Sequence, residues 1–130
     1  MKKLTIFTDG GARGNPGPAG IGVHIKEVGD YKEYIGEATN NQAEYKAVVL
    51  ALAKAKEAGG EELDFYLDSK LVVEQLNGNY KVKDTELAKI FIQIFNLKQS
   101  FKKVTFTHIP REKNTEADKL VNEAIDSFPQ

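Results

Sequence analysis

Hydrophobic and polar residues alternate along the N-terminal part of the chain with the two-residue period of β-strands. Three segments share this pattern: KLTIFTD at 3–9, AGIGVHIKEV at 19–28 and YKEYIGEA at 31–38. The intervening residues 10–18, GGARGNPGP, are rich in turn formers, and Gly29-Asp30 is a short hairpin signal. The pattern predicts three consecutive strands joined by short turns, as in an antiparallel meander.

The next residues change to the helical period. Residues 40–60, NNQAEYKAVVLALAKAKEAGG, begin with Asn40 and Asn41, either of which can cap a helix, and end with two glycines that stop it. The segment ELDFYLD at 62–68 predicts a strand. SKLVVEQLNG at 69–78 then predicts a short helix that begins near its serine and ends at its glycine.

The C-terminal part contains two further helices and a strand. Asp84 can cap a helix with an apolar stripe formed by Leu87, Ile90, Phe91 and Ile94. KVTFTHI at 103–109 predicts a strand, and 114–128, NTEADKLVNEAIDSF, predicts a closing helix capped by Asn114. The order is βββαβααβα, which indicates an α/β fold with a mixed sheet and packed helices. The length predicts a single domain over residues 1–130.

Two acidic residues fall on or beside the apolar faces of predicted helices. Glu44 shares its helix face with small and branched apolar residues at steps of four and three, namely Val48, Ala51 and Ala55. Asp118 lies at the edge of the stripe of the last helix. Both acids are near the starts of their helices, so both could project inward over one end of the sheet.

Two more acids come from strands. Asp68 ends its strand, where α/β sheets commonly carry their chemistry, and Asp9 shares a strand face with Phe7. Four carboxylates brought together would repel one another unless a hard cation such as Mg²⁺, which prefers oxygen ligands, bound between them. A pair of such ions can activate water and stabilise the leaving oxygen in phosphodiester cleavage.

Each acid also has a simpler interpretation. An acidic residue in the first turn of a helix stabilises the helix dipole, which would account for Glu44 and Asp118. Asp68 could cap the helix that follows it. Spacing alone does not show that the four side chains converge, so both interpretations stay open at this point.

Composition and charge limit the kinds of protein that this chain could be. The chain has no cysteine, which excludes disulfides and zinc–thiolate sites, and it has no apolar run of membrane-spanning length. We therefore expect a soluble, cytoplasmic protein without an organic cofactor. The net charge of −1 argues against a simple cationic nucleic-acid binder, but two bound divalent cations would change −1 to +3.

Four blocks of the sequence, taken together, resemble the type 1 ribonuclease H family. They are FTDGGARGNPGPAGIG, TNNQAEYKAV, LDSKLVVEQLNG and HIPREKNTEADKLVNEA, in that family's order, and they span residues 7–124. The resemblance implies a five-stranded mixed sheet, with three antiparallel strands followed by two parallel ones and helices on both faces. It implies an endonuclease that hydrolyses the RNA strand of RNA–DNA hybrids, leaving 5′-phosphate and 3′-hydroxyl ends.

The resemblance also assigns roles to residues. Asp9, Glu44, Asp68 and Asp118 match the acids that hold two Mg²⁺ or Mn²⁺ ions, with Asp9 bridging both. The matches to residues that contact the hybrid are Gly10, Gly11, Asn15, Thr39, Asn40, Asn41, Gln42 and Lys70. Thr39 matches a residue that grips a DNA-strand phosphate, and short amides suit 2′-hydroxyls and base edges in a shallow groove. For the asparagine pair, helix capping alone is the alternative, and for the glycines it is a tight turn.

The sequence departs from the family in two places. Many members carry a histidine in a mobile loop before the last acid, where it assists product release. Here that loop is short and His108 falls at the end of a strand, so Arg111 is the better candidate for a basic catalytic partner. The basic handle of some members is also missing, since residues 77–87 are too few for an extra helix. We therefore predict weak, strongly salt-sensitive hybrid binding by a monomer.

Two other functions remain possible from the sequence. One is a hybrid-binding module that kept the fold and lost turnover. The missing basic handle and the altered loop favour this alternative. The other is a different nuclease or strand-transfer enzyme on the same architecture, because fold alone does not set function. A nucleotide-binding loop is rejected, since neither GxxxxGK[ST] nor GxGxxG occurs.

Overall fold

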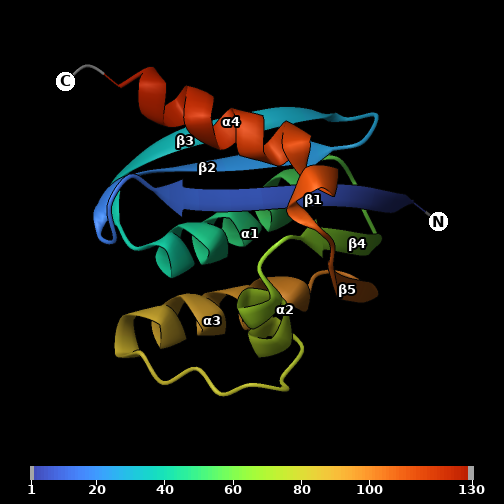
Figure 1. Ribbon diagram of the computed structural model, residues 1–130. Coiled ribbons are helices and arrows are strands. Elements are labelled where there is room, and N and C mark those ends of the chain that lie inside the picture. The colour runs from blue at the N-terminus through green and yellow to red at the C-terminus, as the bar shows by residue number, and fades with distance from the viewer. Residues whose placement is uncertain (1, 129–130) are drawn as a thin grey trace.

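The computed structural model (Figure 1) describes residues 2–128, so the outermost residues of the predicted 1–130 domain lie outside the described part. The strands are β1 (Lys3–Ala12), β2 (Gly17–Ile25), β3 (Gly29–Ala38), β4 (Glu62–Leu67) and β5 (Lys103–His108). The helices are α1 (Asn40–Glu57), α2 (Lys70–Leu76), α3 (Thr85–Lys98) and α4 (Thr115–Asp126), and a short 3₁₀ turn, η1 (Arg111–Lys113), precedes α4. The predicted order βββαβααβα is confirmed.

The five strands form one mixed sheet in the order β3-β2-β1-β4-β5. β1 pairs antiparallel with β2, and β2 with β3, whereas β4 is parallel to both β1 and β5. Three antiparallel strands followed by two parallel ones are therefore confirmed. Because β1 and β4 run parallel and pair from Lys3 and Glu62 to Phe7 and Tyr66, the end of β4 lies beside the middle of β1, close to Asp9.

Helices cover both faces of the sheet, as Figure 1 shows with α4 on one side and α1 and α3 on the other. The main core lies on the α1 side and includes Ile6, Val23, Val48, Leu52 and Phe65, all fully or almost fully buried. Burial of such side chains contributes about 1.5–3 kcal/mol each and is the main term that fixes the layers. Among residues 2–128, no helix is both long and apolar enough to cross a membrane.

Two glycines let the helices approach the sheet closely on opposite faces. A Cβ added at Gly10 would lie 2.2 Å from the backbone carbon of Ala43 in α1. A Cβ added at Gly22 would lie 2.4 Å from the carbonyl oxygen of Ala117 in α4. These close approaches set the start of each helix against the central strands, where the candidate acids are.

Two local predictions were wrong, and a third was confirmed in position only. The β2–β3 turn falls at residues 26–28, with Glu27 at φ 66°, because strand pairing continues through Gly29 and Asp30. The cap of α1 is Thr39, whose side chain accepts from the backbone N–H of Gln42 in a capping box. Asn114 is the N-cap residue of α4, as predicted, but its side chain makes no capping hydrogen bond and instead donates through Nδ2 to Thr8 and Asp68.

Candidate active site

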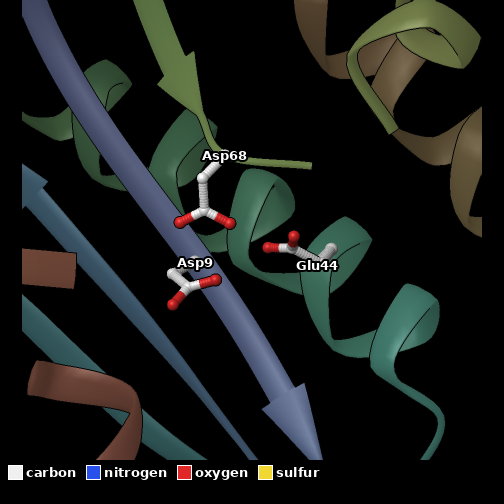
Figure 2. Close-up of side chains that lie close together, drawn as sticks. All are labelled: Asp9, Glu44 and Asp68. Carbon is white, nitrogen blue, oxygen red and sulfur yellow. The ribbon is translucent and has the colours of Figure 1, made fainter. Parts of the chain in front are cut away.

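Three of the four candidate carboxylates meet at one end of the sheet. Asp9 comes from β1, Asp68 directly follows β4, and Glu44 lies in the second turn of α1. One carboxylate oxygen from each residue lies within 4.8 Å of the others. Figure 2 shows the three side chains directed into a common space between the two strands and the helix. The sequence pattern that placed Glu44 on the apolar face of its helix is confirmed, since this side chain is buried.

A backbone amide links two of these acids. The N–H of Gly10 donates to Glu44 Oε1 at 2.8 Å and also to Asp9 Oδ1 at 3.0 Å. The absence of a side chain at Gly10 is what allows α1 to come within reach of this N–H. The glycine therefore contributes to the site by close approach, beyond forming a turn.

Burial and mutual repulsion disfavour the charged forms of these acids. Burial, followed by the charge of Asp68, raises the pKa of Asp9 from 3.8 to about 7. Burial, followed by the charges of Asp9 and Asp68, raises the pKa of Glu44 well above its usual value. Such a cluster favours either protons or a cation between the oxygens. The donor set consists of carboxylate oxygens, which suits hard divalent ions such as Mg²⁺ or Mn²⁺.

Asp68 is held by a neighbour that the sequence pattern did not identify. The Nδ2 group of Asn114 donates to Asp68 Oδ2 at 2.9 Å and to the carbonyl oxygen of Thr8 at 2.9 Å. Asn114 is only 1% exposed. An asparagine just before a helix is normally interpreted as a helix cap. No signal in the sequence distinguishes a cap from a residue that holds Asp68.

The acids lie in an open cleft of about 410 Å³. Asp118 also lines this cleft, but its side chain is exposed and lies outside the group of three. Its negative charge nevertheless contributes to the raised pKa of Asp9. Arg111, in η1, lines the same cleft and is exposed. His108 ends β5 with an exposed side chain and lies outside the cleft lining.

The candidate hybrid-contacting residues divide into two groups. Gly10, Gly11, Asn40 and Asn41 line the cleft with the acids. Asn15, Thr39, Gln42 and Lys70 do not line it. Lys70 is the exposed first residue of α2, just beyond the turn that carries Asp68.

Hydrogen bonds connect most of the polar members of both groups. Asn15 Oδ1 accepts from the N–H of Asn40 at 3.0 Å, and Asn40 Oδ1 accepts from the N–H of Ala12 at 2.9 Å. Gln42 Oε1 accepts from the N–H of Thr39 at 2.9 Å. The β1–β2 loop and the start of α1 are therefore tied together beside the cleft.

Several residues of the cleft were missed by the sequence pattern. They are Ala12, Arg13, Ser69, Val121, Asn122 and Ile125. Arg13 is anchored to α4 by an ion pair of 2.5 Å with Asp126 and a longer hydrogen bond to Asn122. An arginine in a glycine-rich loop gives no sequence signal for such long-range contacts.

Comparison with known proteins agrees with this geometry. The family model described as reverse transcriptase-like matches residues 7–124. Bifunctional protein Rv2228c of Mycobacterium tuberculosis is 42% identical over 98% of this chain, which spans only 37% of that protein. The structure of its N-terminal ribonuclease H domain has a TM-score of 0.93 at 41% identity and covers 98% of this chain and 96% of that one.

Two further relatives match over nearly their whole length. Ribonuclease H of Clostridium botulinum is 36% identical over 98% of this chain and 99% of its own. LC11-RNase H1, isolated from compost, was solved in complex with an RNA/DNA hybrid. That structure has a TM-score of 0.91 at 47% identity and covers 95% of this chain and 96% of the other.

The sheet order, the helices on both faces and the acidic cleft place the molecule in the ribonuclease H-like class. Within that class, the chain belongs to the type 1 ribonuclease H family of enzymes.

Proposed function

We propose that this chain is an endonuclease that hydrolyses the RNA strand of RNA–DNA hybrids and leaves 5′-phosphate and 3′-hydroxyl ends. The observation that carries the proposal is the cluster of Asp9, Glu44 and Asp68 in an open cleft. The hybrid complex of LC11-RNase H1 supports the choice of substrate, because that protein is 47% identical to this chain. One copy carries all the candidate acids, so we propose that it acts as a monomer.

The acids fit two divalent cations, Mg²⁺ or Mn²⁺. Asp9, Glu44 and Asp68 would hold them together with Asp118, which is exposed in the same cleft. The pKa values of Asp9 and Glu44 are raised first by burial and then by the charges of the neighbouring carboxylates, both of which a bound cation would offset. When bound, two such ions would make water a better nucleophile and offset charge on the leaving oxygen.

The protein groups position the substrate and keep the acids oriented. The N–H of Gly10 holds the Glu44 carboxylate beside Asp9, which fixes the cluster before substrate arrives. Arg111 lies at the cleft, where its guanidinium would pair with a phosphate oxygen. Lys70 would provide a second phosphate contact from the start of α2.

The side-chain amides beside the cleft would donate hydrogen bonds to the substrate. The oxygens of Asn15, Asn40 and Gln42 all accept bonds from the protein, which leaves their amino groups as donors. Such donors match the acceptors of a hybrid, namely base edges, 2′-hydroxyl oxygens and phosphates. Thr39 accepts from Gln42 and keeps its own hydroxyl hydrogen for a phosphate oxygen. Gly10, Gly11 and Asn41 line the cleft with the acids and would contact the hybrid there.

The test is cleavage of an end-labelled hybrid in Mg²⁺, Mn²⁺ and EDTA, with the ends of the products identified. The proposal expects cutting only with metal, a 5′-phosphate that a phosphatase removes, and a 3′-hydroxyl that a polymerase extends. Metal-independent cutting, or 3′-phosphate ends, would contradict it. Binding of the hybrid without any cutting would instead make the chain a binding module on a nuclease scaffold.

A further inference from the structure

One buried residue, Asn114, joins the elements that carry three of the four candidate acids. Asn114 lies between η1 and α4, and its Nδ2 group donates to Asp68 Oδ2 and to the Thr8 carbonyl, both at 2.9 Å. Thr8 directly precedes Asp9 in β1. The backbone carbonyl of Asn114 accepts from the N–H of Asp118 at 3.2 Å. This single residue therefore connects β1, the end of β4 and the start of α4.

In holding this arrangement, Asn114 gives up the hydrogen bonds that its side-chain oxygen would otherwise accept. It occupies the cap position of α4, yet it makes no side-chain capping hydrogen bond. Its Oδ1 atom is buried and has no hydrogen-bond partner within the described residues. An asparagine at a cap position normally accepts from the first free N–H groups of its helix. Here the side chain is turned from that role toward the acidic cluster.

A neutral amide suits this position for an electrostatic reason. A lysine or arginine bonded to Asp68 would cancel the charge that attracts a cation, and an aspartate would repel Asp68 and lose both donated hydrogen bonds. An amide donates two hydrogens and leaves the charge of the carboxylate in place. Groups that orient metal-binding residues in this way commonly govern metal affinity without touching the ion.

We infer that Asn114 is a positioning residue that sets the orientation of Asp68 and thereby the affinity of the site for divalent ions. The inference rests on the proposed function only in taking Asp68 as a metal-binding group. It predicts that removal of the amide weakens metal binding and leaves the affinity for the hybrid unchanged. By analogy with other groups that orient metal ligands, the expected loss of metal affinity is about 10- to 100-fold.

The first test is calorimetric titration of Mn²⁺ into the protein without substrate. Asn114→Ala is compared with Asn77→Ala, because Asn77 Nδ2 also donates to a backbone carbonyl, that of Phe106 at 3.2 Å, away from the cleft. We expect weakened binding in Asn114→Ala and wild-type binding in Asn77→Ala. Unchanged Mn²⁺ affinity in folded Asn114→Ala would overturn the inference. If that variant does not fold, Asn114→Ser, which keeps one donor, provides the same comparison.

A double-mutant cycle separates positioning from a general structural role. If Asn114 acts through Asp68, then Asp68→Ala/Asn114→Ala binds Mn²⁺ no more weakly than Asp68→Ala alone. Independent, additive losses would contradict the inference. On the hybrid, kcat at limiting metal should fall in Asn114→Ala while KM for the hybrid stays within about twofold. If the wild-type protein bound Mn²⁺ but cut no hybrid, the proposed function would fail and the titration would still test Asn114.

Discussion

Replacing Asp9 by Asn should stabilise the protein when divalent ions are absent. Asn is nearly the same size as Asp and can still accept the hydrogen bond that the Gly10 N–H donates to position 9. It removes one of three buried or half-buried carboxylates whose oxygens lie within 4.8 Å of one another. The change therefore relieves repulsion and desolvation with little change in packing.

The magnitude follows from the pKa of Asp9, which rises from 3.8 to about 7 in the folded protein. A pKa difference of one is worth about 1.4 kcal/mol, so the ionised form of Asp9 costs at most about 4 kcal/mol at neutral pH. Between these two pKa values the folded protein binds more protons than the unfolded chain. The contribution of Asp9 to the free energy of unfolding therefore falls as pH rises from about 4 to about 7, and it changes no further above this window.

The assay is urea unfolding in EDTA at several pH values, followed by circular dichroism because the chain has no tryptophan. Asp9→Asn should match the wild type near pH 4 and exceed it by about 2–4 kcal/mol near pH 8. A suitable control is Asp126→Asn, since that carboxylate is 65% exposed and pairs with Arg13. Its effect should stay below about 1 kcal/mol.

Added Mg²⁺ should remove most of this difference in stability between the two proteins. At about a hundred times its Kd, a ligand adds about 2.7 kcal/mol to the free energy of unfolding of a protein that binds it. The free energy of unfolding should rise by about this amount for the wild type and by much less for Asp9→Asn. The reasoning is refuted if Asp9→Asn is less stable than the wild type in EDTA near neutral pH, or if the difference is the same at every pH.

Three further predictions concern packing and binding. Tyr45 donates to Gln75 Oε1 at 2.7 Å in the core, so Tyr45→Phe should cost about 1–3 kcal/mol in urea unfolding. Adding Gln75→Leu should restore most of this loss, and an unchanged stability in Tyr45→Phe would contradict the prediction. Gly10→Ala, whose Cβ would lie 2.2 Å from the backbone of α1, should cost about 1–3 kcal/mol or more and weaken Mg²⁺ binding. Gly11→Ala, whose Cβ would meet only side-chain atoms at 3.6 and 4.0 Å, is the control for thermal unfolding, and equal losses in both variants would refute the packing argument. Hybrid affinity, measured by anisotropy in EDTA, should fall roughly tens-fold between 50 and 200 mM salt if about three phosphates are contacted, and a salt-independent Kd would refute this. Lys70→Ala should lower the slope of log Kd against log salt by about one.

The sequence predicted most of the fold because period and turn signals agree along this chain. Alternation identified the three-strand meander, and helical periodicity together with start and stop residues identified the four α-helices. The mixed sheet of three antiparallel and two parallel strands was expected from the family resemblance. The place of β4 beside β1 came only from the structure, because periodicity does not reveal which strands pair. The β2–β3 turn was misplaced since Gly29 and Asp30 pair with Ile25 and His24. Local turn propensity does not include that long-range pairing.

The candidate site was predictable where a residue broke a pattern. Glu44 stood out as an acid on an apolar helix face, and it is buried beside Asp9. Asn114 broke no pattern, because an asparagine before a helix suits an ordinary cap. Thr39, Asn40 and Asn41 are all good caps, and tertiary contacts decide among them, with Asn40 bonded to the β1–β2 loop instead. Which residue caps the helix therefore depends on contacts that form only in the folded protein, and the local sequence does not determine it.

The central claim is tested most directly by single-turnover cleavage with Mg²⁺ on four labelled substrates of one sequence. These are the RNA–DNA hybrid, duplex RNA, single-stranded RNA and duplex DNA, each with wild type and Asp9→Asn. The account predicts cutting of the RNA strand in the hybrid alone, and loss of cutting in Asp9→Asn while the variant still binds the hybrid. Equal cutting of duplex RNA, or undiminished cutting by Asp9→Asn, would contradict it.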